Sequence, residues 1–363
     1  MKRRMFENIL PLYGLNSDDT TVNLFGDGLI NHTWKVTAAE QSYILQKVNT
    51  DVFKEPSNID KNLCLLKDFL NKKDPKYLFV SPINALSGAS LLKTPDGYFR
   101  MTPFVEGSIS LNALTKREEA YEAARQFGKF SALLADFNAE ELNITIPDFH
   151  NLNLRYEQFK TACANANPER MEQAKEYVEF INENKSIVDT YLDLVANKEV
   201  PLRVIHHDTK INNVLFDAHN KGICVIDLDT VMPGYFISDV GDMMRTYLCA
   251  ASEEENDLSK ISIRKDFFKA IYEGYMEEMA DVLTDTEKQY FSYAGKFIIY
   301  MQAIRFLADY LQNDIYYGAK YEGHNFNRAK NQIALLKEYL KMEEALTTPL
   351  SSSKEPRNQP HAQ

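Results

Sequence analysis

The sequence predicts an α+β protein with two lobes, a small β-rich lobe over residues 1–104 and a larger, mainly helical lobe over 105–347. Two observations predict this division. Short strand-like runs bounded by turn residues fill most of the first hundred residues, and long segments with helical periodicity follow them. The terminal segment 348–363 is rich in Ser and Pro without periodicity, so we expect it to be disordered.

Composition and charge limit the classes of function. The 363 residues are 44% hydrophobic and 12% aromatic, which is typical of a globular protein with a sizeable core. The formal net charge of -11 argues against a nucleic-acid-binding surface, because Lys and Arg are the main contacts to phosphate backbones. We find neither a signal peptide nor an apolar run long enough to cross a membrane. We therefore expect a cytoplasmic protein without membrane or nucleic-acid partners, and the oligomeric state stays open.

The expected elements follow in order along the chain. Strands are indicated by NLFGDGLINHTWKVT, SYILQKVN, YLFVSPI and GYFRMTPFVEG. Apolar residues recur on one face of residues 56–70, which predicts a helix. Helices are expected again from residue 115 onward, with 169–195 and 265–311 mostly helical. A compact β-rich insert over 202–229 lies between these two segments.

The segment VIHHDTKINNVLFD carries the strongest chemical pattern. An apolar strand ends at Ile205, a polar loop follows, and the next strand begins at Val214. Within the loop, Asp208, Lys210 and Asn213 have the spacing D-x-K-x-x-N. Phosphoryl transfer needs an oriented acceptor hydroxyl, a positive charge near the moving phosphoryl group and metal ligands. We therefore predict Asp208 as base, Lys210 as the cation and Asn213 as a metal ligand.

A second acidic segment, ICVIDLDT, follows closely. Its strand is expected to pair with residues 214–216 as a hairpin, which would return Asp227 to the loop of Asp208. Mg²⁺ prefers a few carboxylate or amide oxygens together with phosphate oxygens and water. Asp227 and Asn213 meet that preference, with Asp229 as a second carboxylate.

Two further residues are expected to support this loop. Asp239 has two interpretations, as a brace that accepts hydrogen bonds from the loop or as an acidic residue at the start of a helix, and both can hold. We interpret His206 as a structural hydrogen-bonding residue rather than a general base, because Asp208 already fits the position of the base.

Two features upstream suit nucleotide phosphates. Gly26 and Gly28 lie in a turn where glycine lets the backbone approach a phosphate closely, although any tight hairpin also uses such glycines. Lys47 closes a strand and suits a role at the α- and β-phosphates, the alternative being a solvated edge residue. The order of glycine turn, strand lysine, helix, hinge-like strand, D-x-K-x-x-N and I-D favours phosphate binding.

In these residues the sequence resembles the aminoglycoside phosphotransferase and choline kinase superfamily, and most closely the N-acetylhexosamine 1-kinases. The resemblance runs through GLINHTWKV, YILQKVNTDVFKEP, RMTPFVEG, HHDTKINNVLFD, VIDLDTVMPG, DVGDMMR and RFLADYLQNDIYY. It implies a two-lobed protein-kinase-like fold. It also implies transfer of the γ-phosphoryl group of ATP, with Mg²⁺, to the anomeric hydroxyl of an N-acetylhexosamine.

The resemblance carries residue roles onto this chain. Asp208 would be the base, Asn213 and Asp227 would bind the metal, and Lys47 would hold phosphates. A hinge formed by Phe104, Val105 and Glu106 would recognise adenine through its backbone. Sugar contacts are expected from Asn31 or His32, Thr230, Arg305, and Tyr316 or Tyr317. For Arg305, a structural ion pair is the other interpretation.

Two positions depart from the superfamily pattern. His207 stands where glycine is common in an H-G-D motif, which leaves the conformation of the loop open. Lys61 stands where a glutamate would be expected to pair with the strand lysine, so Glu55 and Asp60 are the remaining acidic partners for Lys47.

Two other classes of function are alternatives to a sugar kinase. A phosphotransferase for another small hydroxylated metabolite, such as an aminoglycoside, choline or homoserine, is the main alternative. An aminoglycoside site would be expected to present a dense acidic cluster, whereas this chain has RFLADYLQNDIYY. A non-catalytic nucleotide-binding protein is disfavoured, because Asp208, Asn213 and Asp227 are all present.

Overall fold

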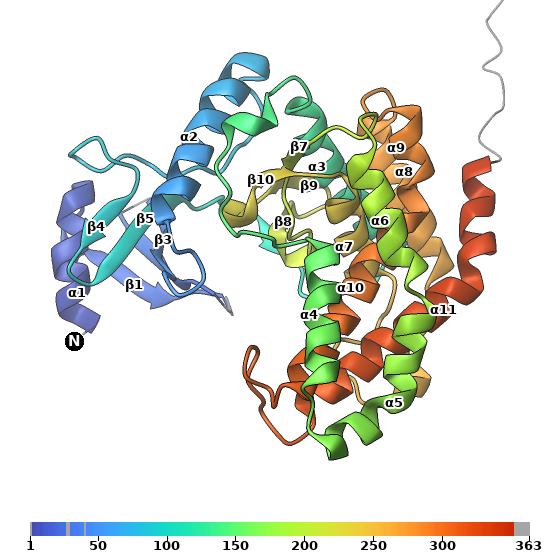
Figure 1. Cartoon of the computed structure of the whole chain (residues 1–363). Helices are drawn as coiled ribbons and strands as arrows, with labels where there is room; N and C mark the ends of the chain where they lie inside the picture. Colours follow the sequence, from blue (N-terminus) through green and yellow to red (C-terminus); the bar gives the residue numbers. More distant parts are fainter. Residues whose placement is uncertain (1, 27–29, 40, 352–363) are drawn as a thin grey trace, which may run out of the picture.

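The N-terminal lobe is built on one antiparallel sheet. The structure, a computed structural model, describes residues 2–26, 30–39 and 41–351 (Figure 1). The strands have the order β1-β2-β3-β5-β4. Their bounds are β1 (Thr20–Leu24), β2 (His32–Ala38), β3 (Gln41–Val48), β4 (Leu92–Thr94) and β5 (Gly97–Pro103).

The two faces of this sheet belong to different cores. Trp34, Leu45 and Phe99 are buried with Ile9 of α1 (Lys2–Ile9) in a small core of their own. Val48 belongs instead to the main core of the molecule, together with the apolar face of α2 (Pro56–Lys73). Since successive side chains of a strand point to opposite faces, this division fixes which residues of β3 face the second lobe.

The C-terminal lobe is mainly helical and is packed around one long buried helix, α10. Most residues of α10 are buried, and the helix contacts α4, α7 and α11 (Figure 1). The helices are α3 (Arg117–Leu133), α4 (Leu152–Ala164), α5 (Pro168–Glu183), α6 (Ser186–Ala196), α7 (Ile237–Tyr247), α8 (Lys265–Met279), α9 (Asp285–Gln289), α10 (Phe291–Leu311) and α11 (His324–Ser351).

Short strands between α6 and α7 form the predicted β-rich insert. β8 (Val214–Phe216) and β9 (Gly222–Val225) pair as an antiparallel hairpin, as the sequence predicted. β6 (Ile109–Ser110) adds to β8. β7 (Arg203–Ile205) pairs with β10 (Met232–Gly234), so the segments before and after the hairpin lie side by side.

The α+β, two-lobed architecture is confirmed, with local differences. The segment YLFVSPI (residues 77–83) is not a strand, because Pro82 lacks an N–H and the segment gives β5 one backbone hydrogen bond, from Ile83 to Met101 at 2.8 Å. α11 continues to Ser351, past the expected start of a disordered tail at residue 348. No helix in the described ranges combines the length and apolar character needed to cross a membrane.

Candidate active site

The loop between β7 and β8 brings together Asp208, Lys210 and Asn213. Lys210 Nζ lies 3.1 Å from Asp208 Oδ1. The Asn213 side-chain amide donates a 2.9 Å hydrogen bond to the Asp208 carbonyl, and Asn213 ends a short 3₁₀ turn. The Asp208 and Lys210 side chains are 21% and 46% exposed, so a ligand can reach both. The D-x-K-x-x-N spacing therefore forms one compact group of side chains.

Helix α7 holds this loop through carboxylates in its first half. Asp239 accepts hydrogen bonds from the backbone N–H groups of His206 at 3.0 Å and His207 at 2.7 Å. Asp242 accepts a third, from the backbone N–H of Thr209 at 2.9 Å. Asp239 is fully buried and also lies in the first turn of α7, so both interpretations of this residue hold.

His206 has the structural role that the sequence suggested. It is fully buried, and its Nε2 atom lies 3.0 Å from the carbonyl oxygen of Ile226. The rings of Phe127 and Phe130 meet it edge-on. Burial lowers the pKa of His206, which disfavours a charged imidazole at neutral pH. The residue therefore links the loop to the strand that precedes Asp227.

His207 adopts a backbone conformation that would suit the glycine expected here from the H-G-D pattern. Its φ of 66° is left-handed, a region that L-residues other than Asn and Asp rarely adopt. Its Nδ1 atom lies 3.2 Å from the carbonyl oxygens of both Ile205 and Thr230, and burial lowers its pKa to about 4. Thr230, predicted to contact the sugar, donates its hydroxyl to the His206 carbonyl at 2.6 Å and so helps to hold the loop.

Asp227 lies beside this loop at the end of the β8–β9 hairpin. The backbone N–H of Ile226 donates to the Asn213 carbonyl at 2.9 Å, which fixes the two segments together. Asp227 has φ 60° and ψ 59°, a left-handed conformation of the kind concentrated at functional sites. Partial removal from bulk water, then the charges of Asp229 and Asp208, raise the pKa of Asp227 to about 7. The residue still keeps an exposed surface that a ligand can reach.

Asp229 joins the two lobes. Its Oδ1 lies 2.5 Å from Arg100 Nη1, and its Oδ2 accepts a 2.7 Å hydrogen bond from the Asn31 amide. Asn31 in turn accepts a hydrogen bond from the Asn49 backbone N–H at 2.9 Å. Asp229 is 2% exposed. The structure thus engages Asp229, predicted as a metal ligand, and Asn31, predicted as a sugar contact, with each other.

The residues present fit a single magnesium ion held together with phosphates. The Asn213 amide nitrogen is engaged with Asp208, which leaves its amide oxygen as a ligand. Among the described residues the Asp227 carboxylate forms no hydrogen bond or ion pair. No three His, Cys, Asp or Glu side chains in the described chain converge as a metal cage. One carboxylate and one amide match Mg²⁺, which takes its remaining ligands from phosphates and water.

The glycine turn follows strand β1, and the hinge follows strand β5. Gly26 has φ 71° with open space where a Cβ would be, whereas Gly28 lies outside the described residues. Phe104, Val105 and Glu106 connect β5 to β6 and so join the lobes. Within the described residues the backbone N–H groups of Val105 and Glu106 donate to no acceptor, which leaves them available to a ligand.

Lys47 and His32 are not brought to the other predicted residues. They face each other across β2 and β3, and Lys47 also faces Phe99 of β5. Phe99 is fully buried in the core under α1. The side chain of Lys47 lies along that same face, because its Cε is 2.9 Å from where a Cβ of Gly97 would be. This placement does not favour the predicted phosphate contact of Lys47.

The predicted acidic partners of Lys47 lie elsewhere. Asp60 accepts a 2.5 Å hydrogen bond from the Ser90 hydroxyl. Neither Glu55 nor Asp60 pairs with Lys47, which forms no ion pair in the part of the chain that the structure describes.

Gln46 and Arg100 occupy the opposite face and were missed. They are cross-strand neighbours, and Arg100 reaches Asp229 in the second lobe. Strand alternation could have found them, because Leu45 is a core residue and Lys47 must share its face.

Arg305, Tyr316 and Tyr317 gather at the end of α10. The Asp309 carboxylate accepts hydrogen bonds from the backbone N–H groups of Tyr316 at 2.7 Å and Tyr317 at 3.0 Å, which orders the turn after the helix. The Arg305 guanidinium lies 5.5 Å from the centre of the Tyr317 ring. Tyr316 is 71% exposed. The predicted arginine and paired tyrosines are thus neighbours.

Arg155 of α4 is a further member of this group that the sequence did not indicate. Burial, then the nearby Arg305, lower the pKa of Arg155. Burial, then His207 and Arg305, lower the pKa of His150. The ring centres of His150 and His207 are 5.3 Å apart, which places His150 beside the loop of Asp208. Within the described residues neither Arg155 nor Arg305 forms an ion pair with a carboxylate.

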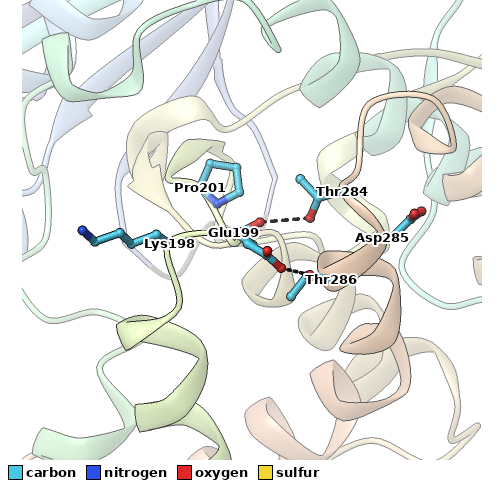
Figure 2. Close-up of a pocket in the computed structure, with 6 residues that line it drawn as sticks. All are labelled: Lys198, Glu199, Pro201, Thr284, Asp285 and Thr286. Carbon is cyan, nitrogen blue, oxygen red and sulfur yellow. Dashed lines mark hydrogen bonds between the residues drawn. The ribbon is translucent and has the colours of Figure 1, made fainter.

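Two cavities differ in how they relate to these groups. One, of about 160 Å³, lies behind the catalytic loop and is lined by His150, His207, Gly234 and Phe297 among others. The other, of about 480 Å³, contains none of the predicted site residues (Figure 2). There the Glu199 backbone carbonyl accepts a hydrogen bond from the Thr284 hydroxyl, and its carboxylate accepts one from the Thr286 hydroxyl.

Comparison with solved structures agrees with this architecture. The chain is similar to a spectinomycin phosphotransferase in complex with ADP and spectinomycin, with 14% identity, a TM-score of 0.57, and coverage of 94% of this chain and 98% of that one. It is also similar to a microcompartment-associated aminopropanol kinase, with 13% identity, a TM-score of 0.60, and coverage of 94% of this chain and 98% of that one. For choline kinase from Cryptosporidium parvum the identity is 14% and the TM-score 0.56, with coverage of 97% of this chain and 98% of that one. At this identity the likeness concerns the fold.

A two-lobed fold with an Asp-Lys-Asn loop and a facing Asp defines a phosphotransferase. A family model described as the phosphotransferase enzyme family matches residues 21–262, about two thirds of the chain. The protein belongs to this family.

Proposed function

We propose that this phosphotransferase is an ATP- and Mg²⁺-dependent kinase that phosphorylates the anomeric hydroxyl of an N-acetylhexosamine, N-acetylglucosamine or N-acetylgalactosamine. The observation that carries the acceptor class is the pair Arg155 and Arg305, which have no carboxylate partner among the described residues. A guanidinium has only donors, so it suits the acetamide carbonyl and hydroxyl oxygens of a neutral sugar. It repels a cationic acceptor.

The nearby carboxylates support the same choice. An aminoglycoside, which is a polycation, would be expected to need free negative charge at its site. Glu253 is paired with Arg245 at 3.0 Å and also with Arg328. Glu254 is paired with His324 at 2.6 Å. These carboxylates are therefore engaged within the protein. The main alternative, a kinase for another small hydroxylated metabolite such as an amino alcohol, is separated from the sugar kinase by experiment.

In the proposed reaction ATP lies between the lobes, with adenine at the backbone of Val105 and Glu106. Asp208 orients the sugar hydroxyl and takes its proton. The hydroxyl oxygen forms a bond to the γ-phosphorus as the bond between this phosphorus and the β,γ-bridging oxygen breaks, and ADP leaves. Lys210, 3.1 Å from Asp208, offsets charge on the transferred group. Asn213 and Asp227 hold Mg²⁺, which supplies positive charge to the phosphate oxygens.

Phosphorus NMR of the purified full chain tests the acceptor. Mg-ATP is offered with N-acetylglucosamine, N-acetylgalactosamine, glucose, choline, homoserine and kanamycin in parallel. The proposal expects a new resonance coupled to the anomeric proton, in the acetamido-sugar samples alone. Product with choline, homoserine or kanamycin instead would reject the acceptor class, and product with none would reject the proposal.

Replacement of the base tests the mechanism. Asp208→Asn removes the proton acceptor and keeps the shape of the side chain. Turnover is expected to fall by about 10²–10⁴-fold, the usual contribution of a general base. The dissociation constant of ATP should change little, since the base contacts the acceptor. Normal turnover with weakened ATP binding would contradict this role.

A further inference from the structure

The strand alternation of β3 separates two adjacent polar residues. Lys47 faces Phe99 in the core under α1, whereas Gln46 faces Arg100 on the other side of the sheet. The Asp229 contact of Arg100 shows that this second face is the one directed at the catalytic segments of the C-terminal lobe. A cation that serves the site from this sheet must therefore come from the Gln46 face.

Arg100 is held on that face by contacts on two sides. Its Nε and Nη2 atoms donate to Gln46 Oε1 at 3.0 and 2.8 Å. Its Nη1 lies 2.5 Å from Asp229 Oδ1, and the residue is 5% exposed. A guanidinium carries more N–H donors than these contacts use. The group is thus fixed in orientation and retains donors for a ligand.

The position of Arg100 matches the place where phosphate charge would lie. Its partner Asp229 lies two residues after the proposed metal ligand Asp227, in the same short turn. Arg100 therefore reaches the segment that carries the proposed metal ligand. Lys35 shares the Gln46 face of the sheet, but its ammonium group lies 3.6 Å from the centre of the Phe104 ring at the hinge. Lys35 therefore belongs with the base end of a nucleotide.

We propose that Arg100, positioned by Gln46 and Asp229, is the N-terminal-lobe residue that binds the phosphates of the nucleotide, in the role expected of Lys47. This inference rests on the proposed nucleotide-dependent function. The planar guanidinium binds phosphate oxygens through parallel hydrogen bonds that an ammonium cannot form. Asp229 takes the part of the acid that orients the cation, and it comes from the C-terminal lobe.

Calorimetry on the full chain tests the proposal with two ligands, Mg-ATP and adenosine. Adenosine shares the base and lacks the phosphates. Arg100→Met is expected to weaken Mg-ATP binding by about tenfold or more, as for loss of a charge-assisted contact, and to leave adenosine binding unchanged. Lys47→Met is the matched control and should bind both ligands like the wild type. Arg100→Lys keeps a partner for Asp229 and should fall between the wild type and Arg100→Met.

The outcomes separate this inference from the proposed function. If Arg100→Met fails to fold, Arg100→Lys decides, because it keeps the buried charge pair and loses the planar fork. Arg100 variants that bind Mg-ATP as the wild type does, or a Lys47→Met variant that loses it selectively, would overturn the inference alone. A wild-type protein that binds adenosine and Mg-ATP equally weakly would overturn the proposed function as well.

Discussion

The backbone N–H of His207 donates a 2.7 Å hydrogen bond to Asp239 Oδ1, while His207 itself holds a φ of 66°. A residue of the catalytic loop is thereby kept in a conformation that its Cβ disfavours by about 1–2 kcal/mol. The strain is held by a helix carboxylate that also binds the preceding residue, His206. The first half of α7 therefore fixes the backbone that presents Asp208.

The strain at His207 predicts an unusual order of stability. His207→Gly and His207→Ala lose the same ring contacts, but only glycine adopts the positive φ freely. The glycine variant should therefore be the more stable of the two by about 1 kcal/mol in denaturant unfolding. His206, which lacks a positive φ, provides the control, and there alanine should be the more stable replacement. An alanine advantage at both positions would contradict the assigned strain.

Asp239 predicts a pH dependence. Burial raises its pKa to about 7 from its usual 3.8. The charges of Asp242 and Asp208 add to this rise, whereas the hydrogen bonds from the backbone N–H groups of His206 and His207 oppose it. Between these pH values the folded protein keeps a proton that the unfolded chain has lost. This group therefore makes the free energy of unfolding fall as pH rises from about 4 to about 7.

Asp239→Asn cannot ionise and should lack this contribution. Its free energy of unfolding, measured in denaturant across that pH window, should decline less steeply than that of the wild type. Since Asp227 titrates in both proteins, the difference between the two curves isolates Asp239. The variant should also turn over more slowly, because an amide NH₂ cannot accept a hydrogen bond from the loop. Parallel curves would show that Asp239 does not hold a proton in this window.

Local spacing predicted that the three polar residues of the loop after β7 come together, because they lie on one short segment. Asp208, Lys210 and Asn213 lie within six residues of each other, and the β8–β9 hairpin that returns Asp227 is signalled by its turn. The two-lobed fold followed from the change between period-2 and helical patterns. These features depend on neighbours in the sequence, which is why the sequence alone was sufficient.

Contacts between the lobes were not predicted, because no local pattern specifies them. Asn31 and Asp229 are 198 positions apart, and their 2.7 Å hydrogen bond depends on how the lobes meet. Lys47 was assigned to the phosphates from its place at a strand end, without regard to its face. Arg155 and Arg305 likewise have no carboxylate partner among the described residues, which depends on where distant helices place their acidic side chains.

Replacement of Asp227, the proposed metal ligand, should cause a loss of Mg²⁺-dependent stabilisation. In the presence of ATP, Mg²⁺ should raise the thermal midpoint of the wild-type protein, because a ligand that binds only the folded state stabilises it. Asp227→Asn should lose most of this shift, and EDTA should remove it from the wild type. Asp281→Asn, at an exposed position, is the control and should keep it. An undiminished shift in Asp227→Asn would place the metal elsewhere.

Arg305→Met predicts a selective loss of acceptor binding. The guanidinium lies 5.5 Å from the centre of the Tyr317 ring, a predicted acceptor contact, so it should contact the acceptor rather than ATP. A hydrogen bond to a charged group contributes about 1.5–3 kcal/mol, so KM for the acetamido sugar should rise by about tenfold or more. KM for ATP and the thermal midpoint should stay close to those of the wild type.

The control for this change is Arg117→Met, at an arginine that is 42% exposed and paired with Glu273 at 2.8 Å. It removes the same group from the surface and should leave both KM values unchanged. A fall in stability of Arg305→Met without a change in KM would favour a purely structural arginine. A rise in KM for the acetamido sugar, with KM for ATP and the thermal midpoint unchanged, would assign Arg305 to the acceptor site.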